Sequence, residues 1–315
     1  GPDRMQSLDW QPVKPRNAVG SVYKDDGVYV ITGGLGALGR LFAENIVEQC
    51  SHATVVLTGR SPPTDAIVQD VNSLQRAHTH VVYMQLDLHD FDSVSTAFDD
   101  LASRYRKVNG IIHCAGMIAD NLIAKKSTQD FRATLLPKVT GTRHLDQASR
   151  HLDLDFFVVF SSIASAMGSI GQSDYAAANG FMDHFIQYRR ERVRRGERSG
   201  ASVSINWPYW QDGGMRIGAT TQAVLAQSIG MLPMATGVGL AAFHDAVAMN
   251  RAQMVVAQGD PAKLLARLRG QSVVEHATPT VAAAQGALTL DRIQKELRLM
   301  LAAVLHARPE DIELR

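Results

Sequence analysis

VYVITGGLGALG, residues 28–39, decides the fold of this chain. Residues 28–32 form an apolar run of strand length, and a turn with four glycines follows as helical spacing starts near Ala37. A glycine-rich turn between a strand and a helix lets the pyrophosphate of a dinucleotide approach the backbone and the helix N-terminus. The alternative is a glycine-rich turn without a ligand, which the flanking strand and helix make less favourable.

Outward from this turn, short apolar runs alternate with longer amphipathic segments. We expect strands at residues 28–32, 53–58, 81–87, 109–115, 155–162, 201–207 and 255–259, and helices that include residues 37–50, 91–106, 128–150 and 174–195. This alternation predicts an α/β fold with a Rossmann-like, doubly wound parallel sheet. Residues 211–235 interrupt the rhythm with glycines and a short amphipathic segment, so we expect a mobile helical lid there.

Composition excludes several classes of protein. A formal net charge of +1 gives no general attraction to polyanions, so nucleic acid is not an expected partner. The two cysteines, Cys50 and Cys114, lie in no zinc-binding pattern, which indicates a reduced, cytoplasmic location and no metal site. No run of about 18 apolar residues is present and the first residues lack the apolar core of a signal peptide, so no membrane association is expected.

At 315 residues, the chain has the length of one main domain with a small appendage. We expect an N-terminal segment at residues 1–26, with Gly1-Pro2 as a candidate tag remnant, and a catalytic domain at residues 27–268. A polar linker is expected at residues 269–286, followed by an amphipathic helix and a turn at residues 287–315. The arginine-rich run at residues 189–195 is expected to form a solvated face at a helix end.

Arg60 follows the second predicted strand, in the sequence TGRS. A protein that binds NAD usually has an acidic residue near this position for the ribose 2′-hydroxyl, whereas arginine can hold a 2′-phosphate with two hydrogen bonds. Arg60 therefore favours NADPH, with a solvated loop arginine as the alternative. Asp87 closes the third strand and is suited to accept a hydrogen bond from the adenine amine, although an N-cap of the next helix would also explain it.

The sequence HCAG, residues 113–116, ends the fourth predicted strand. Its small residues let the backbone pass close to a cofactor ribose. His113 itself is interpreted as a core histidine and not as a catalytic residue. The predicted cofactor-binding residues are Thr32, Gly33, Gly34, Leu35, Gly36, Leu38, Gly39, Arg60, Ser61, Asp87, Leu88, His113, Ala115, Gly116, Lys138 and Pro208.

Four residues are predicted to carry the chemistry. Tyr175 and Asn179 are four residues apart on a predicted helix, so their side chains project from one face. Ser162 lies at the carboxyl end of the fifth strand, where doubly wound folds bind ligands, and Lys138 lies on the helix after the fourth strand. Each alone has an ordinary alternative, as a cap, a solvated charge, or a polar or aromatic helix residue. Their combination behind a dinucleotide-binding turn indicates an active site.

These residue types fit the reduction of a carbonyl group. Tyr175 can donate the proton that the developing alkoxide needs, and the ammonium of Lys138 is expected to lower the tyrosine pKa from about 10. Ser162 is expected to hydrogen-bond the carbonyl oxygen and orient it. Asn179 is expected to hold a water that relays protons to Tyr175 through the lysine.

With this arrangement, and with GQSDYAAAN at residues 171–179, residues 27–268 resemble the ketoreductase domains of modular polyketide synthases, a branch of the short-chain dehydrogenase/reductases. In that branch, the catalytic lysine and asparagine trade places relative to YxxxK enzymes, as Lys138 and Asn179 do here. The resemblance implies NADPH-dependent reduction of a β-ketoacyl chain to a β-hydroxyacyl chain. It also implies an acyl carrier protein, which holds the substrate as a phosphopantetheine thioester, and other synthase domains as partners.

The resemblance further implies a stereochemical assignment. B-type members have an aspartate in an LDD-like triplet, and the triplet here, Ile118-Ala119-Asp120, matches at its last position only. Met167 stands where A-type members place a tryptophan. We therefore expect B-type selectivity and a D-configured hydroxyl, with a loop or helix-cap carboxylate as the alternative for Asp120.

INWPYW, residues 205–210, resembles the family's segment beside the nicotinamide, so Trp207 is assigned to the substrate site. Pro208 stands where a glycine is common, which is expected to reshape the pocket. Residues 287–315 resemble the start of an acyl carrier protein without its GxDS attachment sequence, and too few residues precede Val28 for the family's usual structural subdomain. Two alternatives stay open: a redox-silent or epimerising scaffold domain, and a free-standing reductase of small ketones.

Overall fold

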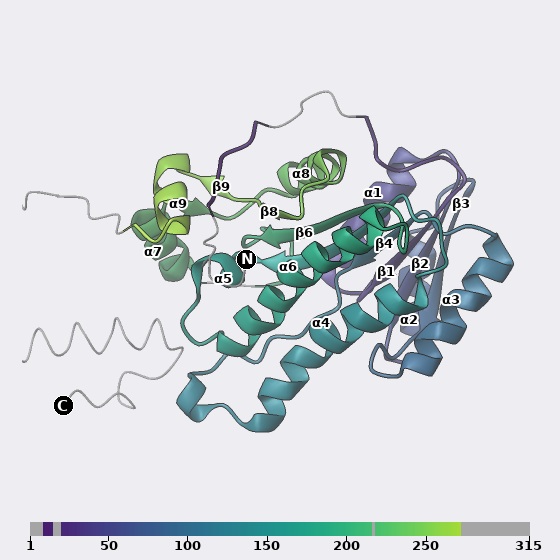
Figure 1. Cartoon of the computed structure of the whole chain (residues 1–315), viewed down its shortest axis with the longest axis horizontal. Coiled ribbons are helices and arrows are strands. Elements are labelled where there is room, and N and C mark those ends of the chain that lie inside the picture. The colour runs from purple at the N-terminus through teal and green to yellow at the C-terminus, as the bar shows by residue number, and fades with distance from the viewer. Residues whose placement is uncertain (1–8, 15–19, 216–217, 272–315) are drawn as a thin grey trace, which may run out of the picture.

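Seven parallel strands form the central sheet of the computed structural model, which describes residues 9–14, 20–215 and 218–271 (Figure 1). The strands are β1 (Gly27–Thr32), β2 (Ala53–Gly59), β3 (Thr79–Gln85), β4 (Gly110–His113), β5 (Phe156–Ser162), β6 (Ala201–Trp207) and β8 (Gln253–Val255). Their order in the sheet is β3-β2-β1-β4-β5-β6-β8. The predicted tag remnant, most of the predicted linker and the predicted tail helix lie outside the described residues.

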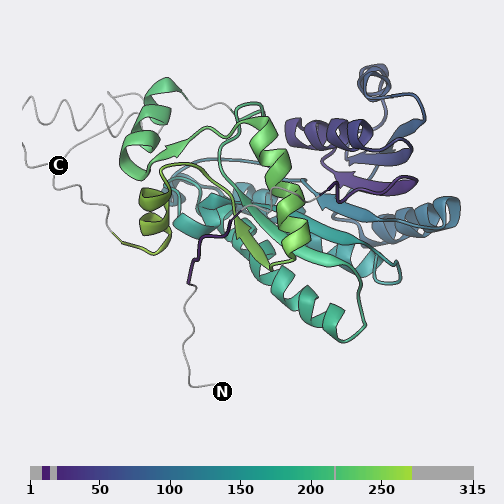
Figure 2. The ribbon, with the colours of Figure 1, turned by 90° about the horizontal axis from the view of Figure 1, so that it is seen from above.

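Helices cover both faces of this sheet (Figures 1 and 2). They are α1 (Ala37–Gln49), α2 (Asp65–Ser73), α3 (Phe91–Tyr105), α4 (Thr128–Ala148), α5 (Ile163–Met167), α6 (Ser173–Arg194), α7 (Ala219–Ile229), α8 (Thr236–Met249) and α9 (Pro261–Leu268), with a short 3₁₀ turn, η1 (Ile123–Lys125). Helices α1, α2 and α8 bury apolar side chains in one core cluster, and α3, α4 and α6 bury theirs in another. The protein is therefore the predicted doubly wound α/β fold.

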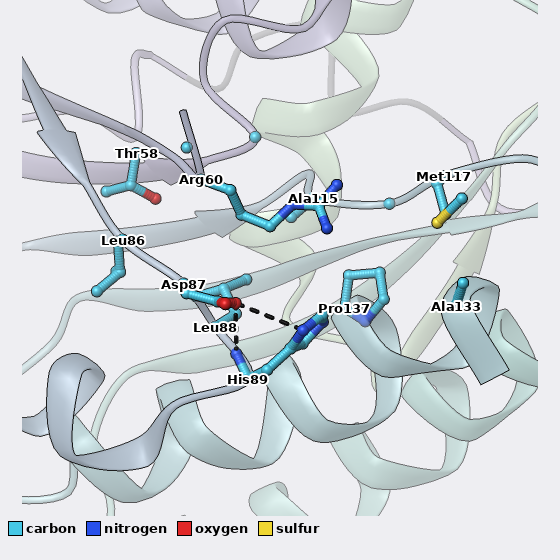
Figure 3. Close-up of a pocket in the computed structure, with 13 residues that line it drawn as sticks. Thr58, Arg60, Leu86, Asp87, Leu88, His89, Ala115, Met117, Ala133 and Pro137 are labelled. Atoms are coloured by element: carbon cyan, nitrogen blue, oxygen red, sulfur yellow. Dashed lines mark hydrogen bonds and ion pairs between the residues drawn. The ribbon is translucent and has the colours of Figure 1, made fainter. Parts of the chain in front are cut away.

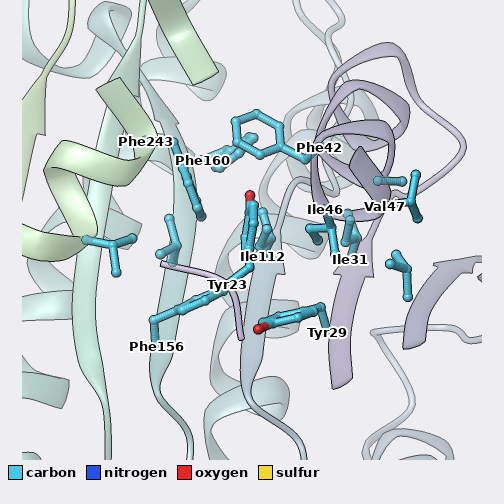
Figure 4. Close-up of a cluster of buried hydrophobic side chains, with 14 of the residues drawn as sticks. Tyr23, Tyr29, Ile31, Phe42, Ile46, Val47, Ile112, Phe156, Phe160 and Phe243 are labelled. Carbon is cyan, nitrogen blue, oxygen red and sulfur yellow. The ribbon is translucent and has the colours of Figure 1, made fainter. Parts of the chain in front are cut away.

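Strand β1 shows why the sheet is covered on both faces. Tyr29 and Ile31 belong to the cluster under α1 and α8, while Val28 and Val30 belong to the cluster under α3, α4 and α6. All six residues of β1 are buried, which is typical of a central parallel strand. Figure 4 shows the aromatic part of the first cluster, where the Tyr29 and Phe156 rings stack with their centroids 5.8 Å apart.

The last strand of the sheet differs from the prediction. The predicted strand at residues 255–259 is wrong, because β8 ends at Val255 and β9 (Gln258–Gly259) pairs instead with β7 (Met231–Leu232) in a separate antiparallel ribbon. Gly259 has a φ of 140°, and a Cβ there would lie 1.9 Å from the carbonyl oxygen of Gly230. The chain therefore leaves the main sheet at a close backbone contact that excludes a side chain.

The strand order reverses between β1 and β4, and open α/β sheets bind ligands in the crevice at such a switch point. The glycine turn follows β1, residues 114–116 follow β4, and Ser162 ends β5 at the same edge. The segment at residues 211–235 does contain a helix, α7. Its role as a lid stays a prediction.

Candidate active site

The turn after β1 requires glycine at more than one position. Gly33 has a left-handed φ of 64°, and a Cβ there would lie 2.8 Å from the Cα of Ala115 in the turn after β4. A Cβ at Gly39, in the first turn of α1, would lie 2.6 Å from the carbonyl oxygen of Gly33. Because the two loops and the start of α1 pack at backbone distance, the turn has the geometry that a dinucleotide-binding site needs.

An open cavity lies beside this turn (Figure 3). It is lined by Gly33, Thr58, Gly59, Arg60, Leu86, Asp87, Leu88, His89, Ala115, Gly116, Met117, Ala133 and Pro137. The predicted cofactor-binding residues that the fold brings together here are Gly33, Arg60, Asp87, Leu88, Ala115 and Gly116. A glycine-lined wall with one arginine fits an anionic dinucleotide.

Sequence reasoning missed the lining residues Thr58, Gly59, Leu86, His89, Met117, Ala133 and Pro137. Most of them directly flank predicted residues in the same strand-to-helix loops, so extending each loop would have included them. Ala133 and Pro137 come from α4 and are four residues apart, so they share one helix face. Because Lys138 was already predicted to lie at the site, this spacing could have predicted that Ala133 and Pro137 lie there too.

His113 is one of the predicted residues that do not line the cavity. It is fully buried, with Nδ1 2.6 Å from the Thr32 hydroxyl oxygen and Nε2 3.1 Å from the Pro137 carbonyl oxygen. Burial, together with the smaller effect of the Lys138 ammonium, lowers the pKa of His113 to about 3. The ring is therefore a neutral core histidine, as interpreted from the sequence. The other predicted cofactor residues outside the lining are Thr32, Gly34, Leu35, Gly36, Leu38, Gly39, Ser61, Lys138 and Pro208.

Arg60 and Asp87 extend from neighbouring strand ends into the cavity (Figure 3). Arg60 is the one arginine in the lining, and its exposed side chain leaves the guanidinium free to meet a phosphate. Asp87 Oδ1 accepts a hydrogen bond from the His89 backbone N–H at 3.0 Å. The N-cap of α3 is Asp90, so the interpretation of Asp87 as a helix cap is wrong.

Lys138 is a buried residue of α4, and its side chain contacts β5 and α6. Its Nζ donates a hydrogen bond to the Phe160 carbonyl oxygen at 2.9 Å and lies 5.6 Å from the centroid of the Tyr175 ring. A Cβ at Gly116 would lie 2.8 Å from the Cε of Lys138, so the glycine makes room for the lysine stem. Burial lowers the pKa of Lys138 to about 8, while Cys114 and Asp183 act in the opposite direction.

Tyr175 lies near the start of α6, half-buried and within reach of the Lys138 ammonium. Burial raises the pKa of Tyr175, and hydrogen bonding with the side chains of Ser162 and Asn179 opposes that rise. The prediction that the pKa of Tyr175 lies below its usual value is therefore wrong. The physical reason is that desolvation of the phenolate outweighs the favourable contacts.

Asn179 and Ser162 both lie close to the Tyr175 hydroxyl. Asn179 is fully buried, and its Nδ2 donates to the backbone carbonyl oxygen of Tyr175 at 2.7 Å. Its Oδ1 has no hydrogen-bond partner among the described residues, so an acceptor is left for a water or a substrate group. Ser162 is the N-cap of α5, where its Oγ accepts from the Ala164 backbone N–H at 3.2 Å. The structure thus brings all four predicted catalytic residues together.

Asp183 is a buried carboxylate beneath this group that sequence reasoning missed. Its Oδ1 accepts from the Ser204 hydroxyl at 2.6 Å, and its Oδ2 accepts from the Ser165 hydroxyl at 2.7 Å and from the Asn206 Nδ2 at 3.0 Å. The same Asn206 Nδ2 lies 3.0 Å from the carbonyl oxygen of Ser162. Tyr175, Asn179 and Asp183 follow one another at intervals of four residues, and this spacing could have predicted that Asp183 shares their helix face.

Asp120 and Met167, the residues with predicted stereochemical roles, lie in the loop after β4 and at the end of α5. Asp120 is exposed in the loop after β4, where its Oδ2 accepts from the Gln172 Nε2 at 2.9 Å. The N-cap of η1 is Leu122, so Asp120 caps no helix there. Because Gln172 lies three residues before Tyr175, its hydrogen bond holds Asp120 near the start of the tyrosine helix, and the negative charge of Asp120 raises the pKa of Tyr175. Met167 is half-buried as the last residue of α5.

Trp207 does not occupy the position that its predicted role requires. Its side chain is buried in the core, with the ring centroid 5.0 Å from that of Trp210 and 5.5 Å from that of Phe160. It lies on the sheet face that is covered by α1 and α8. The assignment of Trp207 to substrate contact is therefore wrong, because neighbouring aromatic rings enclose the indole.

Among the described residues, no group of three or more His, Cys, Asp or Glu side chains is arranged to hold a metal ion. No helix in this part of the chain is long and apolar enough to cross a membrane.

Comparison with known proteins assigns this chain to a family. A family model described as KR domain matches residues 27–212. The polyketide synthase PksN of Bacillus subtilis strain 168 is 37% identical over 314 residues, which make up 97% of this chain and 6% of that protein. PksL of the same strain, also a polyketide synthase, is 43% identical over 237 residues, 75% of this chain and 5% of that protein. The chain thus spans 5 to 6% of the length of these relatives.

Solved ketoreductase structures share the fold. A ketoreductase domain from the bacillaene assembly line is similar with a TM-score of 0.74 at 40% identity, covering 78% of this chain and 59% of that one. An N-terminal ketoreductase from the macrolactin assembly line gives a TM-score of 0.71 at 36% identity, covering 81% and 48%. The residues matched by the family model include the glycine turn and all four predicted catalytic residues. The chain belongs to the KR domain family, the ketoreductase domains of polyketide synthases within the short-chain dehydrogenase/reductases.

Proposed function

We propose that this domain reduces the β-carbonyl of a β-ketoacyl thioester to a hydroxyl, with NADPH as the reductant and an acyl carrier protein as the substrate carrier. The observation that carries the proposal is the joint placement of Lys138, Ser162, Tyr175 and Asn179 at the switch point of the sheet. The reductant supplies a hydride to the carbonyl carbon. The protein supplies the proton and fixes the position of the carbonyl oxygen.

The proton comes from the Tyr175 hydroxyl to the oxygen of the former carbonyl. Ser162 is placed to donate a second hydrogen bond to that oxygen, which stabilises the charge that develops on it. The phenolate left on Tyr175 is stabilised by the nearby Lys138 ammonium. Asn179 offers its unpaired Oδ1 to a water that can return a proton to the pair.

The choice of NADPH rests on Arg60, the one arginine in the cavity lining. A guanidinium at the end of β2 can bind a 2′-phosphate bidentately, and Asp87 offers a carboxylate to the adenine amine. Gly33 and Gly39 let the turn after β1 pack at backbone distance, which is the geometry that a pyrophosphate-binding turn needs. For the stereochemical outcome, Asp120 beside Tyr175 supports B-type reduction to a D-configured hydroxyl.

The test is reduction of a β-ketoacyl N-acetylcysteamine thioester, followed as NADPH consumption together with product identification. Tyr175→Phe should reduce turnover at least about a hundredfold, because it removes the proton donor, while NADPH still binds. Tyr188→Phe is a matched control, since Tyr188 is an exposed residue of the same helix. Turnover that survives Tyr175→Phe would contradict the mechanism, and NADPH binding without oxidation by the wild type would favour a redox-silent domain.

A further inference from the structure

Lys126 and Asp174 form a buried ion pair outside the catalytic group. Their Nζ and Oδ2 atoms are 2.6 Å apart, and their side chains are only 2% and 1% exposed. A buried pair of opposite charges does not by itself stabilise a fold, because the desolvation of both charges offsets their attraction. The position of this pair therefore points to a more specific role.

The pair joins three segments at the active site. Lys126 Nζ also donates to the carbonyl oxygen of Ala119 at 2.6 Å, directly before Asp120. Asp174 directly precedes Tyr175, and its Oδ1 accepts from the Tyr175 backbone N–H at 2.8 Å. Thr134 of α4 lies against the same carboxylate and helps to lower the pKa of Asp174. One buried contact thus connects the loop that carries Asp120, the helix α4 and the start of the tyrosine helix.

Two further bonds attach the same loop to the residues before Tyr175. Gln172 Nε2 donates to Asp120 Oδ2 at 2.9 Å, and the backbone N–H of Asn121 donates to the Gly171 carbonyl oxygen at 2.9 Å. The loop has little apolar anchoring of its own, since Met117 and Ile118 are 37% and 42% exposed. Its position therefore depends on polar bonds, of which the Lys126 bonds are the most buried.

We propose that the Lys126–Asp174 pair fixes Asp120 beside Tyr175 and thereby determines the face on which the ketone is reduced. The inference rests on the proposed function. A ketone can receive a hydride on either face, and the proton donor is fixed on α6, so the loop facing the substrate must favour one orientation of the acyl chain. Lys126 and Asp174 act through Asp120 and are positioning residues.

The first test is the ratio of the two hydroxyl configurations formed from a β-ketoacyl N-acetylcysteamine thioester. Asp174→Asn and Lys126→Met should each lower this ratio at least about tenfold, with NADPH binding unchanged. Lys126→Arg, which keeps the charge, should restore most of the selectivity. Lys125→Met is the matched control, because Lys125 is an exposed neighbour on η1, and it should keep the wild-type ratio. An unchanged ratio in folded Asp174→Asn protein would overturn the proposal.

The second test needs neither substrate nor turnover. The Asn121 amide, which bonds to the Gly171 carbonyl, should exchange its hydrogen at least about tenfold faster in Asp174→Asn than in the wild type, while core amides of β1 keep their rates. Equal exchange rates at Asn121 in the two proteins would overturn the positioning role of the Lys126–Asp174 pair. An inactive wild type would contradict only the proposed function, because this exchange measurement does not depend on activity. If Lys126→Met fails to fold, Gln172→Ala replaces it as the second variant beside Asp174→Asn. Gln172→Ala removes an exposed hydrogen bond to Asp120 and should also lower the ratio of the two hydroxyl configurations.

Discussion

Lys138 Nζ lies 5.6 Å from the centroid of the Tyr175 ring, and its hydrogen bond runs to a neutral acceptor, the Phe160 carbonyl oxygen, at 2.9 Å. The ammonium is close enough to stabilise a phenolate. It is also buried, and this burial lowers the pKa of Lys138 to about 8. In the proposed mechanism the same residue therefore serves the reaction, and it weakens the fold while it is protonated.

Replacing Lys138 with methionine should change how stability depends on pH. The folded-state pKa of about 8 lies below the unfolded value, which is about 10.4. Between these values the unfolded chain binds more protons, so the wild type should gain stability over the variant as pH rises, by up to about 1.4 kcal/mol per pH unit. Urea unfolding of both proteins between pH 7 and 10 measures this gain. Parallel stability curves for the two proteins would show that Lys138 does not titrate in this range.

The fold was predictable where the local pattern and the final packing agree. The run at residues 28–32 became β1, and the spacing of Tyr175 and Asn179 correctly placed both on one face of α6. The end of the sheet was not predictable in this way. VVAQG reads as one strand, but the close approach of Gly259 to Gly230 splits it, and the two glycines are far apart in the chain.

Residues whose partners are distant in sequence were the hardest to predict. Arg189 stands in an arginine-rich run and was expected to be solvated. It is instead fully buried, with Nε 3.0 Å from Asp146 Oδ1 and its guanidinium 4.5 Å from the centroid of the Phe157 ring. A run of charged residues predicts exposure unless a buried residue of opposite charge pairs with one of them. That partner, Asp146, lies on another helix, α4, so the local sequence around Arg189 does not indicate the pair. The raised pKa of Tyr175 has the same origin, because desolvation depends on tertiary burial.

Changing Arg60 to aspartate should reverse the preference between the two nicotinamide cofactors. Charge-assisted hydrogen bonds contribute about 1.5–3 kcal/mol, so the ratio of kcat/KM for NADPH over NADH should fall about 10- to 100-fold. Repulsion between the new carboxylate and the 2′-phosphate adds to the effect. Arg150→Asp is the matched control, since Arg150 is exposed beyond the far end of α4. A ratio that does not move in Arg60→Asp would exclude Arg60 from cofactor choice.

Gly39→Ala should weaken both the fold and cofactor binding. Alanine is the better helix former, but its Cβ would lie 2.6 Å from the Gly33 carbonyl oxygen and 2.7 Å from the Gly34 Cα. Both of these are backbone atoms, so relieving the contact requires a shift of the main chain. Overpacking of this kind costs about 1–3 kcal/mol. Gly237→Ala, in the first turn of α8, has nothing within 4 Å and should instead be neutral or slightly stabilising. Thermal unfolding and NADPH titration of both variants check this contrast.

Asp183 couples the stability of the site to its chemistry. Its two carboxylate oxygens accept from Ser204, Ser165 and Asn206, so an asparagine side chain would leave at least one of these donors facing an amide N–H₂ group. The free energy of unfolding should fall by about 1–3 kcal/mol. The negative charge of Asp183 also raises the pKa of Lys138, against the larger effect of burial.

Asp183→Asn should therefore move the alkaline limb of the reduction rate to lower pH. If the ammonium form of Lys138 is required, wild-type kcat/KM should decline as pH rises through about 8, roughly tenfold per unit well above the pKa. Without the Asp183 charge the ammonium is less stabilised, so the limb begins at a lower pH. Asp100→Asn, an exposed substitution on α3, should leave the limb in place. A purely structural loss would lower the rate at every pH without shifting the limb, so the pH profile separates an electrostatic role of Asp183 from a packing role.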